Sequence, residues 1–205
     1  MTETLFAREN PIYREMMTHV PLFAHRKPQH IAIHDEDCRG LAEEALKHAD
    51  IATVWLVGSQ EKLQDARTQS FPGTLHEFLL QADKGSIDLL IIGSTDPVDL
   101  DLCINALRED GILIQLGESP FDLPALRKTQ LALKTAGFAD TLPLNFPQPH
   151  FPTGWRAATM ASKHGTIKRP REKDIFNKTF ATGYYNLDMH KAAFALPEFM
   201  RKEFA

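Results

Sequence analysis

A chain of 205 residues with 43% hydrophobic and 24% charged side chains has the composition of an ordinary globular protein, and its length suits one sizeable domain. A formal net charge of −4 gives no broad basic field for a nucleic-acid backbone, which argues against nucleic acid as a partner. Two cysteines are too few for a disulfide scaffold, and residues 1–10 lack the apolar core of a signal peptide, so we expect a cytoplasmic protein. No apolar stretch approaches the roughly 20 residues that span a bilayer, which excludes membrane insertion.

The first predicted element is an amphipathic helix over about residues 10–24, whose apolar residues recur at helical spacing. Beyond it, short apolar runs alternate with segments of helical composition. Four of these runs have the length and residue types of strands: residues 30–34, 51–57, 88–92 and 111–117. Near-continuous apolar strands in such an alternation predict an α/β fold, in which helices cover both faces of a mostly parallel central sheet.

The second half of the chain continues the pattern. A predicted helix ends at Gly137, the residue type expected just past a helix end. Residues 153–163 are predicted to form a final strand, residues 163–174 a charged, solvated loop, and residues about 190–203 a C-terminal helix. We therefore expect a single domain over residues 1–205.

Ligands of parallel α/β sheets bind beyond the carboxyl ends of the strands. This rule selects three loops: residues 34–40, 57–60 and 93–99. The third loop reads Gly-Ser-Thr-Asp-Pro-Val-Asp and places a carboxylate, Asp96, directly before a proline. Asp96 is therefore a candidate for chemistry. The alternative is that it only stabilises the turn through a bond from its side chain to the backbone.

Three stretches of the sequence resemble spermidine synthase, a polyamine aminopropyltransferase: IYREMMTHVPLFAH at residues 12–25, STDP at 94–97 and YYNLDMHKAAFALPEF at 184–199. The resemblance extends over nearly the whole chain. It implies a Rossmann-like, methyltransferase-type fold and a role in polyamine biosynthesis. It also implies a homo-oligomer, a dimer, and a small N-terminal β-domain ahead of the first helix, which we expect this chain to lack.

The activity implied by the resemblance is transfer of an aminopropyl group from decarboxylated S-adenosylmethionine, a co-substrate rather than a tightly bound cofactor, to putrescine. The attacking amine must be neutral, but an alkylamine with a pKa near that of lysine, about 10, is protonated at neutral pH. A proton acceptor is therefore required. In the family the loop after the fourth strand carries two aspartates, of which the first accepts the proton; here Gly93 and Asp96 stand at these positions. The resemblance thus leaves Asp96 as the candidate catalytic residue, as base or substrate anchor, with Thr95 beside it in the substrate site.

The family's glycine-rich cofactor turn corresponds here to residues 35–40, Asp-Glu-Asp-Cys-Arg-Gly, and its ribose-binding acid corresponds to Gly58. Each lost charged hydrogen bond would weaken cofactor binding by about 1.5–3 kcal/mol. The opposing interpretation is that Asp35, Glu36 and Asp37 supply the missing negative charge, because a cationic cofactor is attracted to any nearby carboxylate. These three residues are the predicted cofactor-binding residues.

On the amine side, the resemblance places Tyr13 and Phe151 as aromatic walls of the substrate pocket, Phe151 standing where the family has tyrosine. Arg14 replaces a polar residue, and its charge is expected to repel a cationic substrate. The residues of the terminal segment, Tyr184 to His190, are expected to be structural. No metal site is predicted, because the acidic loop after the first strand has no second cluster of metal-ligand residue types to accompany it.

Two functions stay open on these grounds. One is an aminopropyltransferase with an eroded active site, and the other is a catalytically inactive relative that acts as a binding or subunit-interaction protein. An open acidic pocket beside Asp96 would favour the enzyme. A site plugged by Leu75 or Phe151 would favour the binding protein.

Overall fold

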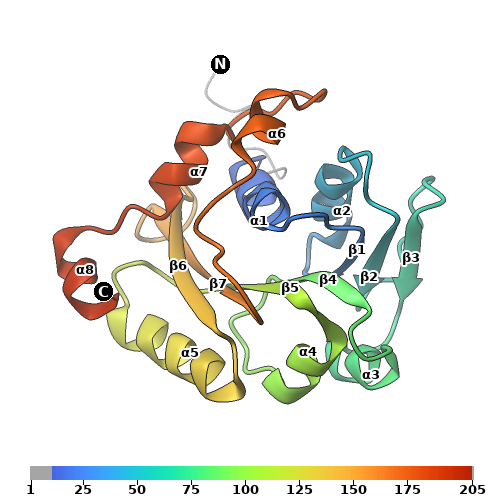
Figure 1. The fold of residues 1–205 in the computed structure, drawn as a ribbon, viewed down its shortest axis with the longest axis horizontal. Coiled ribbons are helices and arrows are strands. Elements are labelled where there is room, and N and C mark those ends of the chain that lie inside the picture. The colour runs from blue at the N-terminus through green and yellow to red at the C-terminus, as the bar shows by residue number, and fades with distance from the viewer. Residues whose placement is uncertain (1–10, 205) are drawn as a thin grey trace.

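The computed structural model describes residues 11–204; residues 1–10, on which the prediction of no signal peptide falls, and residue 205 lie outside the described part of the chain. The strands are β1 (His30–His34), β2 (Thr53–Val57), β3 (Thr68–Phe71), β4 (Ile87–Ile92), β5 (Leu107–Leu116), β6 (Asp140–Pro147) and β7 (Trp155–Ser162). They form one seven-stranded sheet in the order β3-β2-β1-β4-β5-β7-β6 (Figure 1). The first five strands pair in parallel, and β7 runs antiparallel to β5 and β6, which confirms the predicted mostly parallel sheet.

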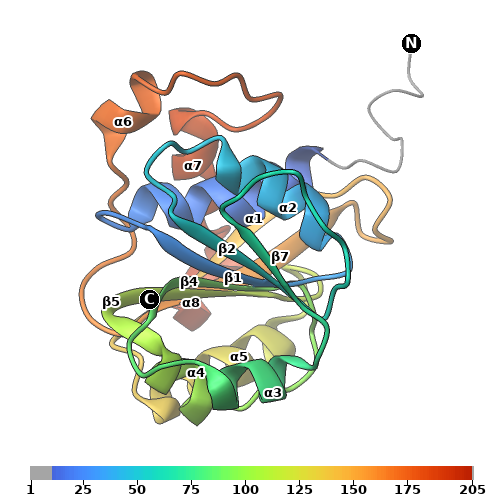
Figure 2. The same ribbon diagram turned by 90° about the vertical axis from the view of Figure 1, so that its right-hand side faces the viewer.

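Helices cover both faces of the sheet (Figure 2). One face carries α1 (Pro11–Ala24), α2 (Cys38–Leu46), α6 (Glu172–Phe176) and α7 (Leu187–Ala193), and the other carries α3 (Leu75–Gln81), α4 (Leu100–Ala106) and α5 (Leu123–Ala136). Every residue of the central strand β4 is buried, as expected for a strand covered on both faces. Leu89 and Ile91 belong to the core under α1 and α2, whereas Leu90 and Ile92 belong to the core under α3 and α4. This alternation is the two-residue period of a strand.

Several elements differ from the predicted ones. The C-terminal helix expected over about residues 190–203 is divided into α7 and α8 (Glu198–Phe204), because Pro197 has no N–H to donate and disfavours a helical conformation in the residue before it. The edge strands β3 and β6 are additional: β3 has no buried residue, and β6 contains Pro143 and Pro147, which an edge strand tolerates. Within residues 11–204 no helix combines the length and the apolar character needed to cross a membrane.

A buried carboxylate fixes the C-terminal segment to α1. Glu15 is 2% exposed and accepts hydrogen bonds from the backbone N–H groups of Gly183, Tyr184 and Tyr185 at 2.6–2.8 Å. The hydroxyl of Tyr185 lies 2.8 Å from Nδ1 of His190 on α7. These contacts give the terminal Tyr-Tyr-Asn segment a structural role, as the sequence predicts.

Candidate active site

A cavity of about 1000 Å³ opens at the carboxyl ends of β1, β2, β4 and β5. Strands β2 and β3 extend the sheet on one side of β1, whereas β4 and β5 extend it on the other, so the cavity lies at the topological switch point where α/β sheets bind ligands. Five carboxylates line it: Asp35, Glu36, Asp37, Asp96 and Glu118. Among its described lining residues Arg156 is the only arginine or lysine. The cavity therefore favours a cationic ligand.

Asp35 is the first residue after β1. Its Oδ2 accepts a hydrogen bond from the hydroxyl of Tyr13 on α1, and its Oδ1 accepts one from the backbone N–H of Asp37 at 2.5 Å. Burial raises the pKa of Asp35, and these two hydrogen bonds oppose the rise without cancelling it. Burial also raises the pKa of Tyr13, which therefore keeps its proton. Asp35 thus has a greater affinity for a proton than an ordinary aspartate, and it faces the cavity.

Asp35 lies against Gly93, the first residue after β4. The parallel register pairs His34 with Ile92, so the next residue of each strand stands side by side with the other. A Cβ added to Gly93 would lie 1.5 Å from Oδ2 of Asp35 and 2.8 Å from the hydroxyl oxygen of Tyr13. Only glycine at position 93 therefore leaves room for the Asp35 carboxylate in this position.

Arg14 and Asp37 form an ion pair at the side of the cavity. The Nε of Arg14 donates to Oδ2 of Asp37, and its Nη2 donates to Oδ1 at 2.9 Å. Oδ1 of Asp37 also accepts from the backbone N–H of Gly40 and so caps α2. The prediction that Arg14 repels a cationic substrate is wrong, because Asp37 neutralises the charge of Arg14. The ion pair also means that Asp37, predicted to bind the cofactor, already has a cationic partner, whereas Glu36 is exposed at the cavity.

The loop after β4 presents Thr95 and Asp96 to the cavity, where both are exposed. Ser94 organises the turn: its Oγ accepts from the backbone N–H of Asp96 at 2.9 Å and lies 2.7 Å from Oδ2 of Asp96, to which it donates. The side chain of Gln115 donates to the backbone carbonyl of Asp96 at 3.1 Å. The side chain that bonds the backbone in this turn is therefore that of Ser94, and the carboxylate of Asp96 faces the cavity.

The aromatic residues stand at the walls and leave the cavity open. Tyr13 and Phe151 both line it, and the guanidinium of Arg156 lies 4.3 Å from the centre of the Phe151 ring. The same guanidinium is 3.8 Å from Oε2 of Glu118, so part of its charge is compensated. Leu75 lines a neighbouring hollow instead. Neither of the two residues expected to plug an inactive site does so.

Known proteins of similar sequence identify the family. No family model matches the chain. The polyamine aminopropyltransferase of Methylococcus capsulatus is 36% identical over 94% of this chain and 76% of that protein, and the one of Thioalkalivibrio sulfidiphilus is 34% identical over 96% and 79%. The chain belongs to the polyamine aminopropyltransferase family.

Solved structures agree with this assignment. The spermidine synthase of Thermotoga maritima superposes with a TM-score of 0.84 at 27% identity, over 96% of this chain and 75% of that one. A spermidine synthase in complex with the transition-state analogue AdoDATO gives 0.85 at 26% identity with the same coverage. A SAM-dependent methyltransferase of Archaeoglobus fulgidus, at 10% identity and a TM-score of 0.57, shares the fold alone. These neighbours confirm the predicted Rossmann-like, methyltransferase-type fold.

Four titratable side chains at the cavity of this family member are not among the predicted site residues: His34, Glu118, His150 and Arg156. Glu118 follows the end of β5, so the rule that ligands bind beyond strand ends selects it once β5 is located. His150 and Arg156 come from the connection between β6 and β7 and from β7 itself. The resemblance that places Phe151 at the pocket also brings this connection to the cavity, but it assigns no role to His150 or Arg156.

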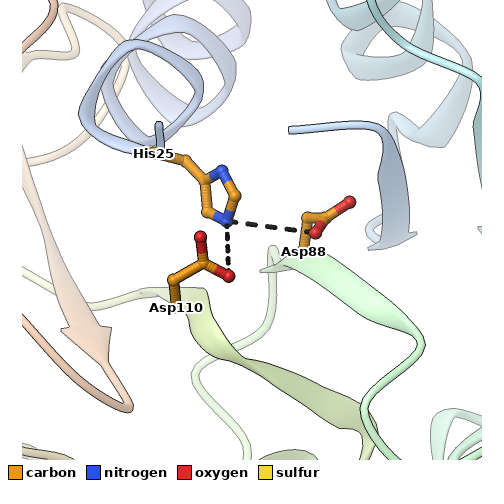
Figure 3. A group of neighbouring side chains, drawn as sticks. All are labelled: His25, Asp88 and Asp110. Atoms are coloured by element: carbon orange, nitrogen blue, oxygen red, sulfur yellow. Dashed lines mark ion pairs between the residues drawn. The ribbon is translucent and has the colours of Figure 1, made fainter. Parts of the chain in front are cut away.

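A second group of titratable side chains lies at the opposite end of the sheet. His25, Asp88 and Asp110 bring their ligand atoms within 4.8 Å of one another, a spacing that could hold a metal ion (Figure 3). The backbone N–H of Lys27 donates to Nδ1 of His25 at 3.1 Å, so the neutral ring carries its proton on Nε2, the atom that faces the two carboxylates. Arg108 also lies 3.3 Å from Asp88. Nε2 of His25 is buried and has no hydrogen-bond partner among the described residues, and it lies 4.0 and 3.6 Å from oxygens of Asp88 and Asp110.

Proposed function

We propose that this chain is an aminopropyltransferase of polyamine biosynthesis, which transfers the aminopropyl group of decarboxylated S-adenosylmethionine to putrescine. The observation that carries the proposal is the open acidic cavity at the switch point. Both substrates are cationic, and five carboxylates line the cavity with one arginine. The names of the curated relatives support the same reaction class.

The reaction is an in-line displacement. The amine nitrogen forms a bond to the carbon beside the sulfonium, the carbon–sulfur bond breaks, and its electron pair remains on the sulfur of methylthioadenosine. The attacking nitrogen also gives up a proton. Asp96, with Thr95 beside it, anchors the diamine, because a carboxylate holds an ammonium group through charge-assisted hydrogen bonds. Tyr13 and Phe151 supply apolar walls for its methylene chain.

The donor side of the site is built differently from a glycine-rich turn. Asp35, Glu36 and Asp37 place carboxylates toward the cationic donor, but Asp37 is already paired with Arg14. Gly58, at the end of β2, offers no carboxylate to a ribose. We therefore infer an eroded site with a high KM for the donor and no tightly bound cofactor.

The competing function is that of a polyamine-binding relative without turnover. It is favoured by one observation, the replacement of a backbone-lined turn by the side chains of residues 35–37. Such a protein would use the same acidic cavity to bind an amine but would lack an adequate grip on the donor. The two functions therefore predict the same response to putrescine and different responses to the donor.

The deciding experiment incubates the purified full chain with putrescine and decarboxylated S-adenosylmethionine and follows spermidine and methylthioadenosine by mass spectrometry. Equal amounts of both products are expected. If neither rises above a sample without protein, the enzyme proposal is wrong, and calorimetric titration with putrescine then tests the binding protein. The homodimer and the cytoplasmic location stay predictions; sedimentation velocity tests the first.

A further inference from the structure

The proposed reaction needs a carboxylate that can remove a proton from an ammonium group, and the five carboxylates of the cavity differ in their suitability. Asp37 is held by Arg14, and Glu118 faces Arg156. The charge of each of these two carboxylates is therefore already opposed by a guanidinium of the protein itself. Glu36 and Asp96 are exposed and therefore in contact with solvent.

Asp35 is different from the other four carboxylates. It is partly buried, it lines the cavity at the end of β1, and its hydrogen bonds come from the neutral hydroxyl of Tyr13 and from a backbone N–H. A general base is most effective when its pKa lies close to the working pH, and burial moves an aspartate in that direction. These features single it out among the carboxylates of the cavity.

We propose that Asp35 is the proton acceptor for the attacking amine and that Gly93 is the residue that makes room for it. The inference rests on the proposed aminopropyl transfer. In the step, an N–H bond of the attacking nitrogen breaks, its electron pair forms the new bond to carbon, and the proton forms an O–H bond on Asp35. Asp35 returns the proton to solvent through the open cavity after the products leave.

Residues 35 and 93 cannot both place a side chain at this point of the cavity. A Cβ at residue 93 would lie 1.5 Å from Oδ2 of Asp35, so the carboxylate of residue 35 occupies the space in which a side chain of residue 93 would begin. The register of β1 and β4 brings both residues to the same point at the floor of the crevice. A carboxylate can therefore reach this point from residue 35 or from residue 93, but not from both.

Tyr13 acts as a positioning residue. Its hydroxyl donates to Oδ2 of Asp35 and would lie 2.8 Å from a Cβ at Gly93, so the tyrosine fixes the carboxylate in the gap left by the glycine. The ring packs 6.3 Å from that of Phe146, between ring centres. Removal of the hydroxyl is expected to change the pH at which Asp35 works, because one of the hydrogen bonds that favour its ionised form is lost.

The first test is Asp35→Asn in the full chain, assayed with saturating putrescine and decarboxylated S-adenosylmethionine. The change keeps the shape of the side chain and an acceptor for Tyr13 while removing the base. We expect kcat to fall about 100-fold or more, with the KM for putrescine changed less than about threefold. The acid limb of the kcat–pH profile should disappear in Asp35→Asn and move to higher pH in Tyr13→Phe. Asp50→Asn, the same chemical change at an exposed turn residue, is the matched control and should behave as the parent.

The second test moves the carboxylate across the gap. Asp35→Gly alone should lose activity, and Gly93→Asp alone should lower the melting temperature because of the crowding. The double variant Asp35→Gly with Gly93→Asp should restore the melting temperature and bring kcat to within about tenfold of the parent. Rescue of kcat is a result that a merely structural role for Asp35 would not give.

The outcomes separate the two proposals. If the parent protein transfers the aminopropyl group and Asp35→Asn keeps its kcat and pH profile, the role of Asp35 is wrong and the proposed function stands. If the parent forms no product, both proposals fail together. If Asp35→Asn does not fold, the double variant decides: a folded and active protein supports the proton-acceptor role, and a folded but inactive one, or one that does not fold, overturns it.

Discussion

The two ends of strand β4 carry carboxylates in opposite circumstances. At the amino end, Asp88 is 1% exposed, accepts backbone N–H groups of Gln29 and His30 at 2.9 and 2.7 Å, and faces Arg108. At the carboxyl end, Asp96 is exposed in a cavity of about 1000 Å³. Protein donors satisfy the first carboxylate, whereas the second faces the space in which a ligand would bind.

The difference separates an acidic cluster inside the fold from the acidic cluster of the candidate site. Both ends bring carboxylates and histidines together, so residue types alone do not distinguish them. What distinguishes Asp88 from Asp96 is burial, because a buried carboxylate must be satisfied by the protein alone whereas one that faces an open cavity is also accessible to solvent or a ligand. The predictions below test this contrast from the largest expected effect to the smallest.

The largest effect is expected at Asp88, at the amino end of β4. Asp88→Ala leaves two backbone N–H groups and His25 without their carboxylate, and should lower the free energy of unfolding by about 3–5 kcal/mol, as removal of one partner of a buried pair does. Urea denaturation followed by circular dichroism measures the loss. The matched change Asp110→Ala, at a side chain that is 55% exposed, should cost less than about 1 kcal/mol. Equal losses at the two positions, reproduced in the parent by addition of a chelator, would instead indicate a bound metal ion.

Acid should destabilise the protein through the partly buried His48. Burial, together with the charges of His19 and Arg171, lowers the pKa of His48 from 6.5 to about 3. Between these two pH values the unfolded chain binds a proton that the folded chain does not, so stability rises with pH and is lost as pH falls. The contribution from His48 is about 2 kcal/mol between pH 6.5 and 5. The urea midpoints of the parent and of His48→Gln should converge as the pH falls over this range. A constant difference between the two midpoints would contradict the lowered pKa of His48.

Beyond the carboxyl end of β4, Asp96→Asn should weaken the binding of the diamine and leave the fold unchanged. Loss of a charged hydrogen bond to the diamine should raise the KM for putrescine about tenfold, with kcat changed less than about threefold. Steady-state kinetics at saturating donor measures both values. Asp101→Asn, on the exposed surface of α4, is the control. A fall in kcat at constant KM would make Asp96 the proton acceptor in place of the substrate anchor.

The smallest effect is expected at the aromatic wall. Phe151→Tyr adds a hydroxyl at a residue that lines the cavity and keeps the ring on which Arg156 stacks. An additional hydrogen-bond partner for the amine should lower the KM for putrescine by about threefold or less. Titration calorimetry with putrescine alone checks the same change without turnover. A higher KM would show that the cavity has no room for the hydroxyl at this edge of the ring.

Much of the fold could be predicted because its signals are local. The apolar runs that form β1, β2, β4 and β5 and the glycine after α5 act through their immediate neighbours in the chain. The edge strand β3 could not be predicted in the same way, because it has no buried residue and is held in the sheet by pairing with β2. The edge strand β6 buries Leu144 and Phe146, but its two prolines obscure the strand pattern. The division between α7 and α8 has a local signal, Pro197, which the helical pattern around it concealed.

The sequence by itself determined the class of the fold and the family and selected loops that line the cavity, because periodicity and motifs are properties of short stretches. All seven of the site residues that it predicts line the cavity: Tyr13, Asp35, Glu36, Asp37, Thr95, Asp96 and Phe151. Only the tertiary structure decided how these side chains meet: Arg14 is neutralised by Asp37, and Asp35 fills the gap at Gly93. The physical reason is that such contacts depend on the register between β1 and β4 and on the packing of α1 across them, which no short stretch of sequence encodes.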